Sequence, residues 1–290
     1  MNGSTFAIVV TYHPRQDVLG RLVSSLNAGE CRVIVIDNTP GPLQFDLPGA
    51  CTVARLGDNF GIARAQNVGI GMARDAGALA LLFFDQDSTV QPGLVEQLVS
   101  RLDVHKPQVV GAVYFDDREG FECPAYKLNQ IGYPNKISTG TNTAPFPVDV
   151  RISSGSAITA VTFDVAGLMD EGLFLDYVDI EWCLRARARG VPILVDPASS
   201  MRHAIGDKTV EVGPLRVFVD NPVRTYYRMR NALLLLRKKD VPVIFAAKEI
   251  TSELVHHLLQ VLLIPDRMQR LNAYVLGIWH GLRGVGGRKP

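Results

Sequence analysis

The chain has 290 residues, of which 47% are hydrophobic and 20% are charged, an ordinary composition for a globular protein with a large core. No stretch of about 18 uncharged apolar residues occurs, so we expect no membrane-spanning helix, and we expect no signal peptide. The four cysteines form no Cys-x-x-Cys pair, which is typical of reduced core thiols in a cytoplasmic protein.

The net charge of +1 hides an uneven distribution of charge along the chain. Residues 202–290 contain 15 Lys and Arg against 7 Asp and Glu, which gives +8. Residues 1–201 contain the other 15 basic and 22 acidic residues, which gives −7. The acidic part suits a metal site, and the basic part suits an anionic surface or ligand.

Strand and helix patterns alternate along the first part of the chain. Apolar runs bounded by turn residues predict strands at 6–11, 32–36, 52–56, 78–84 and 108–115. Helical spacing of apolar residues predicts helices at 18–26, 62–76 and 92–104. This alternation favours an open, mostly parallel α/β sheet with helices on both faces. Ligands of such sheets bind at the carboxyl ends of the strands, where Thr11, Asp37 and Asp85 lie.

Two carboxylates, Asp85 and Asp87, follow the strand predicted at 78–84. Residues i and i+2 of an extended chain point the same way. Both carboxylates can therefore face one Mg²⁺ or Mn²⁺ ion and leave positions open for a phosphorylated substrate. A simple strand-end turn explains the same residues without a ligand, because Asp and Ser favour turns.

The pattern after these strands is less regular. Residues 116–150 are rich in Pro, Gly, Asn and Thr, and long irregular segments in compact domains are often functional. A strand interrupted by Ser-Gly-Ser is expected at 151–160. Asp179 is placed to open a helix that ends at Gly190. From residue 221 onward the pattern is helical.

Several short motifs follow one another along residues 5–236. They are Ile-Val-Val-Thr-Tyr-His-Pro, Val-Ile-Asp-Asn, Asn-Phe-Gly-Ile-Ala-Arg-Ala-Gln-Asn, Phe-Phe-Asp-Gln-Asp-Ser, Ser-Ser-Gly-Ser, Asp-Tyr-Val-Asp-Ile-Glu-Trp, a late His203 and Tyr-Tyr-Arg-Met-Arg-Asn. Together they resemble a family 2 inverting glycosyltransferase with the GT-A fold. More narrowly, they resemble bacterial rhamnosyltransferases that use dTDP-L-rhamnose in the synthesis of cell-surface polysaccharide. The resemblance implies a nucleotide-binding α/β domain at 1–236 and a helical C-terminal extension at 237–290.

The resemblance also implies a site for a nucleotide-sugar donor, with dTDP-rhamnose favoured and a UDP-sugar as the other option. Asp37 would accept a hydrogen bond from the ring N–H of thymine or uracil, although an Asx-turn would use the same residue. Thr11 would lie against the nucleoside. The other donor contacts that the resemblance implies are Asn59, Gly61, Arg64 and Asn67. Glycine lets the backbone approach closely, and a helix N-terminus favours the diphosphate. Arg64 could equally be a solvated charge.

A divalent metal ion, Mn²⁺ or Mg²⁺, is the cofactor that the resemblance implies. Asp87 would bind the ion directly, and Asp85 would contact the ribose or a metal-bound water. His203 would complete the coordination, although a lone histidine is more often structural. A histidine ligand would favour Mn²⁺ over Mg²⁺, because imidazole is softer than carboxylate.

Inverting transfer needs a base that deprotonates the acceptor hydroxyl on the side opposite the leaving group. By resemblance, Asp179 keeps the position of this base, although the acid that precedes it in the family is Val178 here. Glu181 would support Asp179 or replace it as the base. Both acids are otherwise explained as residues of a helix N-terminus, favoured by the helix dipole.

The C-terminal part is basic and helical. Arg228 and Arg230 could bind a diphosphate of the donor or of a lipid-linked acceptor, or could form a snorkelling surface. Apolar clusters within 241–284 fit amphipathic helices on a membrane surface or a helical pair that forms a homo-oligomer. The expected acceptor is a saccharide, free or polyprenyl-diphosphate-linked, and no nucleic-acid partner is expected. The expected location is the cytoplasm, peripheral on the inner face of the cell membrane.

Two other interpretations fit single motifs. Phe-Phe-Asp-Gln-Asp-Ser-Thr-Val also matches haloacid-dehalogenase-like phosphatases, in which Asp85 would be a covalent nucleophile and Asp87 an acid and base. However, that family usually opens with this motif, whereas 84 residues precede it here. A catalytically silent nucleotide-sugar binder is the third interpretation; the departure at Val178 supports it, and Asp179 argues against it.

Overall fold

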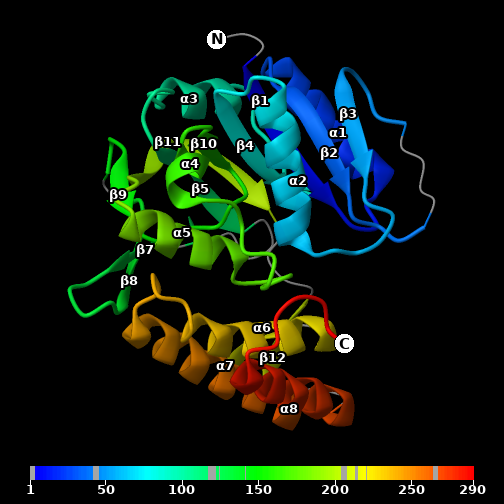
Figure 1. Ribbon diagram of the computed structural model, residues 1–290, viewed down its shortest axis with the longest axis vertical. Coiled ribbons are helices and arrows are strands. Elements are labelled where there is room, and N and C mark those ends of the chain that lie inside the picture. The colour runs from blue at the N-terminus through cyan, green and yellow to red at the C-terminus, as the bar shows by residue number, and fades with distance from the viewer. Residues whose placement is uncertain are drawn as a thin grey trace.

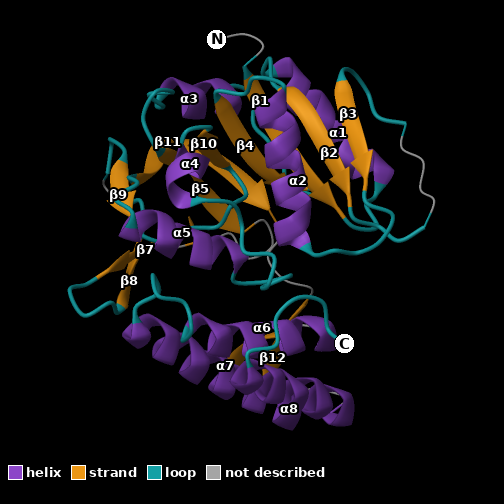
Figure 2. Ribbon diagram, viewed as in Figure 1, coloured by secondary structure: helices purple, strands orange, loops and turns teal. Residues whose placement is uncertain are grey.

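The computed structural model describes residues 4–41, 46–116, 122–123, 125–140, 142–203, 208–212, 215–219, 221–263 and 267–290. A central sheet has the strand order β3-β2-β1-β4-β10-β5-β11-β9, with β6 paired to β5 (Figure 1). Helices cover both faces of this sheet, and a separate layer of helices lies beneath it (Figure 2). The predicted α/β class is therefore confirmed.

Four parallel strands form the first half of the sheet. They are β1 (Thr5–Thr11), β2 (Arg32–Asp37), β3 (Cys51–Arg55) and β4 (Ala80–Asp85). All four lie close to their expected bounds. The register pairs Thr11 with Asp37 and Val10 with Asp85, so the strands end together at one edge of the sheet.

The second half of the sheet is mixed. Its strands are β5 (Val109–Asp116), β6 (Glu122–Cys123), β9 (Phe146–Val148), β10 (Ser156–Thr159) and β11 (Ile193–His203). β10 runs antiparallel between β4 and β5, whereas β11 is parallel to β5. The interrupted strand expected at 151–160 is shorter than predicted, because a turn occupies its first residues. Two small hairpins complete the sheets: β7 (Ala125–Leu128) with β8 (Pro134–Ile137), and β12 (Lys208–Val212) with β13 (Leu215–Val219).

Each face of the sheet has its own hydrophobic core, because side chains alternate between the faces along every strand. Phe6 and Ile8 of β1 belong to one core, and Ala7 and Val9 belong to the other. The first core is covered by α2 (Ile62–Asp75), α4 (Thr162–Ala166) and α5 (Val178–Ala188). The second core is covered by α1 (Gln16–Ala28) and α3 (Leu94–Ser100).

The C-terminal helices are α6 (Pro222–Leu235), α7 (Val243–Leu263) and α8 (Arg267–Arg283), which lie side by side beneath the carboxyl edge of the sheet (Figure 1). Asn221 caps α6 by accepting a hydrogen bond from the Arg224 amide at 2.9 Å, and Pro222 occupies the first turn. None of the described helices is long and apolar enough to cross a membrane. The division of the chain at residue 236 remains a prediction.

Candidate active site

A cavity of about 830 Å³ opens at the carboxyl ends of the strands, between the sheet and α6. Residues far apart in the sequence line it, and they come from β1, β4, α5 and α6. The predicted site residues among them are Thr11, Asn59, Gly61, Asp85, Asp87, Asp179 and Arg228. The volume suits a ligand of the size of a nucleotide sugar.

Thr11 and Asp37 meet at the ends of neighbouring strands. The Thr11 hydroxyl donates to Asp37 Oδ1 at 3.3 Å, and the Thr39 amide donates to the same oxygen at 3.1 Å. The Asp37 side chain is 1% exposed and lies behind Thr11 rather than in the cavity lining. The structure therefore places Asp37 next to the cavity and Thr11 in its wall.

The loop before α2 is held by two asparagines. Asn38 Oδ1 accepts from the Phe60 amide at 2.8 Å, and Asn38 Nδ2 donates to Asn59 Oδ1 at 3.0 Å. Asn59 Oδ1 also accepts from the Gly61 amide at 3.0 Å. Asn38 is not among the site residues predicted from the sequence, although it directly follows Asp37 in one of the motifs.

Gly61 brings this loop against the segment that precedes α5. Its φ is +85°, and a Cβ atom there would lie 2.5 Å from the carbonyl oxygen of Phe174. The same oxygen accepts a hydrogen bond from the Ile62 amide at 2.8 Å. Only glycine permits this close approach without strain.

Two predicted donor residues on α2 lie outside the cavity lining. The exposed Arg64 guanidinium stacks over the Phe60 ring at 4.6 Å. The Asn67 side chain brackets the backbone of Met169, accepting from its amide at 2.8 Å and donating to its carbonyl oxygen at 3.0 Å. Asn67 therefore positions the segment before α5.

The tip of β4 is fixed on both sides. Gln86 pairs with the backbone of Tyr12, accepting from its amide at 2.8 Å and donating to its carbonyl oxygen at 3.2 Å. The Asp85 amide donates to Ser154 Oγ at 3.1 Å, and that hydroxyl lies 3.2 Å from Ser88 Oγ. Asp85 and Asp87 both line the cavity.

The carboxylates of Asp85 and Asp87 fit a divalent ion that keeps most of its coordination positions for water and phosphate oxygens. Among the described residues, no group of three or more His, Cys, Asp or Glu side chains could hold a metal ion alone. His203 ends β11 opposite Asp116, and its side chain lies outside the described part of the structure.

Asp179 lies in the first turn of α5 and in the cavity wall. Its carboxylate accepts from the Ile180 amide at 2.9 Å and from the Ser153 amide at 3.3 Å. Burial raises the pKa of Asp179 to about 6; the charges of Asp85 and Asp176 add to this rise, and the two amide donors oppose it. A carboxylate with this pKa is ionised at neutral pH and is a stronger base than an ordinary aspartate.

Glu181 does not line the cavity. It is 4% exposed, and its carboxylate pairs with Arg185 at 2.8 Å. Arg185 in turn donates to the Leu168 carbonyl oxygen at 2.9 Å. The neighbouring Trp182 is 2% exposed and donates to the Gly167 carbonyl oxygen at 2.9 Å, so it is a core residue.

The segment that leads into Asp179 has an unusual backbone. Phe174, Asp176 and Tyr177 have φ angles of +64°, +59° and +63°. Each such residue costs about 1–3 kcal/mol unless its surroundings hold it. Asn231 supplies this support, because its side-chain Nδ2 donates to the carbonyl oxygens of Leu173 at 2.9 Å, Leu175 at 2.7 Å and Asp176 at 3.0 Å.

Arg230 belongs to the same support. It is 0% exposed, and it donates to the Leu173 carbonyl oxygen at 2.8 Å and to Asn231 Oδ1 at 2.9 Å. Burial lowers the pKa of Arg230. The structure therefore places Arg230 inside the protein, away from the cavity lining.

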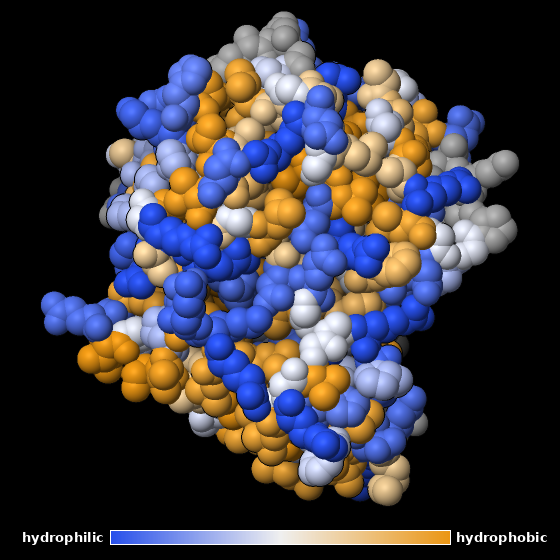
Figure 3. Space-filling view, viewed as in Figure 1, coloured by the Kyte–Doolittle hydropathy of each residue, from blue (hydrophilic) through white to orange (hydrophobic). Residues whose placement is uncertain are grey.

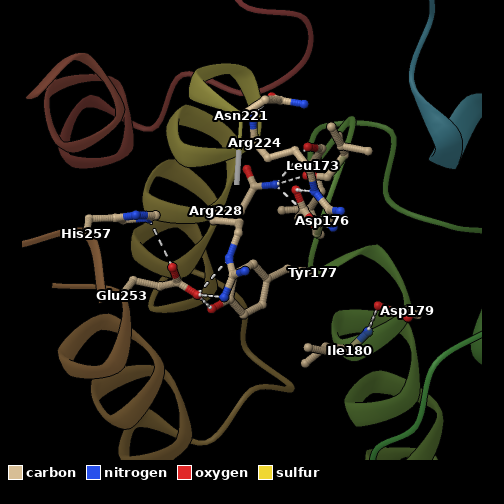
Figure 4. Close-up of polar contacts among 12 residues, drawn as sticks. Leu173, Asp176, Tyr177, Asp179, Ile180, Asn221, Arg224, Arg228, Glu253 and His257 are labelled. Carbon is tan, nitrogen blue, oxygen red and sulfur yellow. Dashed lines mark hydrogen bonds and ion pairs between the residues drawn. The ribbon is translucent and has the colours of Figure 1, made fainter. Parts of the chain in front are cut away.

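Side chains of α6 and α7 form a second set of polar contacts next to the cavity (Figure 4). Arg228 pairs with Glu253 at 2.7 Å, and the Tyr177 hydroxyl donates to Glu253 at 2.9 Å. Glu253 Oε2 also lies 3.1 Å from His257 Nε2. Burial alone would raise the pKa of Glu253, but His257 and Arg228 hold it at about 2.

A buried arginine that the sequence did not reveal supports the turn before β10. The Arg151 guanidinium fills the space that a Cβ atom at Gly111 would occupy. It donates to the carbonyl oxygens of Ala112 at 3.2 Å and Gly155 at 3.4 Å and to the Ser156 hydroxyl. Burial lowers the pKa of Arg151 to about 10.

Comparison with known proteins gives two matches in sequence. The profile of Glycosyl transferase family 2 matches residues 7–159. The chain is 36% identical to the dTDP-rhamnosyl transferase RfbF of Shigella flexneri over 290 residues, which cover 99% of this chain and 98% of that protein.

Solved structures with the same fold have much lower identity. One is GalNAc-T7 with UDP, GalNAc and Mn²⁺, at 14% identity and a TM-score of 0.56, covering 87% of this chain and 54% of that chain. Another is S. aureus TarS 1–349 with UDP-GlcNAc, at 13% identity and a TM-score of 0.55, covering 97% of this chain and 81% of that chain. These similarities confirm the predicted GT-A type of fold.

Proposed function

The chain belongs to glycosyl transferase family 2 and is a glycosyltransferase, and we propose that it moves L-rhamnose from dTDP-L-rhamnose to an acceptor hydroxyl with inversion. The observation that carries the proposal is the meeting of Asp85, Asp87 and Asp179 in one cavity. The full-length similarity to a dTDP-rhamnosyl transferase supports this choice of sugar. The acceptor is a saccharide, free or carried on a lipid diphosphate, in the synthesis of cell-surface polysaccharide.

Asp179 is the base in this proposal. It takes the proton of the acceptor hydroxyl as the acceptor oxygen forms its bond to the anomeric carbon of rhamnose. The bond from that carbon to the diphosphate oxygen breaks at the same time, and dTDP leaves with the electron pair. The raised pKa of Asp179, about 6, supports this role. Glu181 acts indirectly, because its carboxylate is engaged by Arg185.

The donor nucleotide occupies the end of the cavity near Thr11, Asn59 and Gly61. Asp37, placed behind Thr11, orients the residues that contact the thymine. Arg228 lines the cavity and is the best-placed basic residue for the diphosphate.

Three residues expected at the donor shape the site from outside it. Arg64 and Asn67 stabilise the loop and the segment next to the cavity. Arg230 supports the backbone that leads into α5.

Asp87, together with Asp85, would hold Mn²⁺ or Mg²⁺. His203 would be a further ligand of the same ion. Such an ion would neutralise the negative charge that builds on the departing diphosphate. A solved structure with this fold contains Mn²⁺, which supports a divalent ion. Asp85, Asp87 and Arg228 would hold the diphosphate on one side of the rhamnose, and Asp179 would lie on the opposite side.

The phosphatase and the silent binder are not favoured. A phosphatase would not explain why the whole chain, rather than the Asp-Gln-Asp motif alone, resembles a transferase. A silent binder would not need a carboxylate at the position of the base in the cavity wall, where Asp179 lies.

The test of the donor is turnover against a panel of nucleotide sugars with water as acceptor, read as release of nucleoside diphosphate. We expect dTDP-L-rhamnose to be consumed fastest, and the Asp87→Ala variant to lose this activity. Faster consumption of a UDP-sugar would overturn the choice of donor. Release of phosphate from simple monoesters, with no dependence on a nucleoside, would overturn the glycosyl transfer itself.

A further inference from the structure

The outer surface of the last two helices is apolar. Of the 22 large hydrophobic side chains that are exposed among the described residues, 11 lie on α7 and α8. Those on α7 are Val243, Ile244, Leu254, Val255, Leu258 and Leu262. Those on α8 are Met268, Leu271, Val275, Trp279 and Leu282. We call these eleven side chains the outer stripe; apolar side chains gather at the bottom of the molecule in Figure 3, where α7 and α8 lie.

The polarity of α7 is the reverse of what a core-facing helix shows. Its buried side includes Glu253, His257 and Gln260, which are 1–2% exposed. An amphipathic helix at a protein surface normally buries its apolar stripe and exposes its charges. An exposed apolar stripe of this kind indicates a surface that contacts a partner.

The charges around the outer stripe select the kind of partner. α8 contains no Asp or Glu. The two acidic residues of α7, Glu249 and Glu253, are paired with Lys248 and Arg228 on its inner side. A second copy of this chain would bring basic residues against basic residues, whereas an anionic surface complements them.

The basic residues also have the placement that a lipid surface requires. Arg267 and Arg283 are exposed at the two ends of α8. The Arg283 guanidinium lies 5.0 Å from the centre of the Trp279 ring. Tryptophan and arginine pairs of this kind suit the region between lipid head groups and acyl chains.

We infer that the protein docks on an anionic lipid bilayer through the outer stripe of α7 and α8, with both helices lying in the plane of the membrane surface. No described helix could cross the bilayer, which agrees with in-plane binding. Apolar side chains enter the interface, and the basic residues attract the anionic head groups.

Docking in this orientation brings the cavity close to the bilayer. Glu249 lines the cavity from the inner side of α7, opposite the outer stripe. One helix of roughly 10 Å diameter therefore separates the cavity from the lipid. This consequence, which rests on the proposed function, would favour an acceptor carried on a lipid.

The test is co-sedimentation of the full chain with vesicles of phosphatidylcholine alone or mixed with phosphatidylglycerol. We expect binding to the mixed vesicles that weakens as salt is added. The double variant Leu258→Gln/Leu262→Gln should bind at least about tenfold more weakly, because both leucines leave the apolar region. These leucines are 57% and 56% exposed, so the changes leave the core intact.

A matched control separates the outer stripe from general surface polarity. The double variant Leu79→Gln/Leu168→Gln changes two leucines of the α/β part that are 40% and 45% exposed, and it should bind vesicles like the unmodified protein. A third variant, Arg267→Gln/Arg283→Gln, should lose binding to the anionic vesicles while its circular dichroism spectrum stays unchanged.

Several outcomes would overturn the inference. The unmodified protein could fail to bind either vesicle, or the Leu258→Gln/Leu262→Gln variant could bind as well as the control. A protein that sediments as a dimer, and becomes a monomer only in this variant, would assign the outer stripe to a second copy. Turnover of a nucleotide sugar without vesicles is measured alongside, so that failure of docking is distinguished from failure of the proposed function.

Discussion

Replacement of Asp179 by Asn should slow transfer strongly and at the same time stabilise the fold at neutral pH. The pKa of Asp179 is raised in the folded protein, mainly by burial. The folded state therefore binds this proton more tightly than the unfolded state, and ionisation of the carboxylate destabilises the fold. The cost is negligible well below the unfolded pKa of 3.8, grows as the pH rises from there to the folded pKa of about 6, and is nearly complete at pH 7.

The size of the effect follows from the two pKa values. A rise from 3.8 to about 6 corresponds to about 3 kcal/mol at neutral pH, since one pH unit is about 1.4 kcal/mol. This value is an upper limit, because water in the cavity screens part of the charge. Asparagine also keeps only one side-chain oxygen for the two backbone amides, which costs about 1 kcal/mol. The net gain for Asp179→Asn at pH 8 is therefore about 1–2 kcal/mol.

Thermal unfolding of both proteins between pH 4.5 and pH 8, with EDTA present to exclude metal effects, measures this gain. At roughly 2 °C per kcal/mol for a chain of this length, the variant should melt about 2–4 °C higher than the unmodified protein at pH 8. The advantage should shrink steadily as the pH falls from the folded pKa of about 6 towards the unfolded value of 3.8. A difference in melting temperature that does not change with pH would refute the burial of an ionised Asp179.

Three further changes follow from the geometry of the cavity. The Asp87→Ala variant should lose the extra thermal stabilisation by dTDP that Mn²⁺ provides, whereas dTDP without metal should stabilise both proteins equally. In the Gly61→Ala variant, residue 61 would need a φ near +85° and its Cβ atom would lie 2.5 Å from the Phe174 carbonyl oxygen. This variant should lose about 2 kcal/mol of stability in urea unfolding and should bind dTDP more weakly in calorimetry. Unchanged affinity would contradict the placement of this loop. The Asn231→Ala variant, which removes the donor shared by three carbonyl oxygens, should lower kcat more than it raises KM for the donor, and the reverse split would contradict a positioning role.

The regular part of the fold could be predicted because it depends on local patterns. Each of the first four strands is a largely apolar run closed by turn residues, and two of their three connections contain a crossover helix, α1 or α2. The convergence of Thr11 and Asp85 at one edge followed from this topology. The position of β10 between β4 and β5 could not be predicted, since long-range antiparallel pairing leaves no period in the sequence.

The roles of buried charges were harder to predict. Arg228 and Arg230 are two residues apart on one basic helix, and the sequence suggested the same anion-binding role for both. In the structure Arg228 reaches the cavity wall, whereas Arg230 is fully buried beneath the segment before α5. The sequence shows that the two arginines lie on one helix, but the direction in which each side chain points depends on how α6 packs.

The pairing of Glu181 with Arg185 could have been predicted from their spacing in the sequence. Arg185 follows it by four residues, and oppositely charged side chains at this spacing pair on one face of a helix. The structure contains that ion pair. The raised pKa of Asp179 had no such signal, because burial by distant residues causes most of it.

The proposed function depends most directly on Asp179 as the base that removes the proton from the acceptor. The most direct measurement is the rate of rhamnose transfer from saturating dTDP-L-rhamnose for the unmodified protein, Asp179→Asn and Glu181→Gln, with dTDP affinity measured for each. We expect Asp179→Asn to bind dTDP normally and to transfer about 10²–10⁴-fold more slowly, whereas Glu181→Gln should lose less than about tenfold. Transfer by Asp179→Asn at the unmodified rate would contradict this role of Asp179.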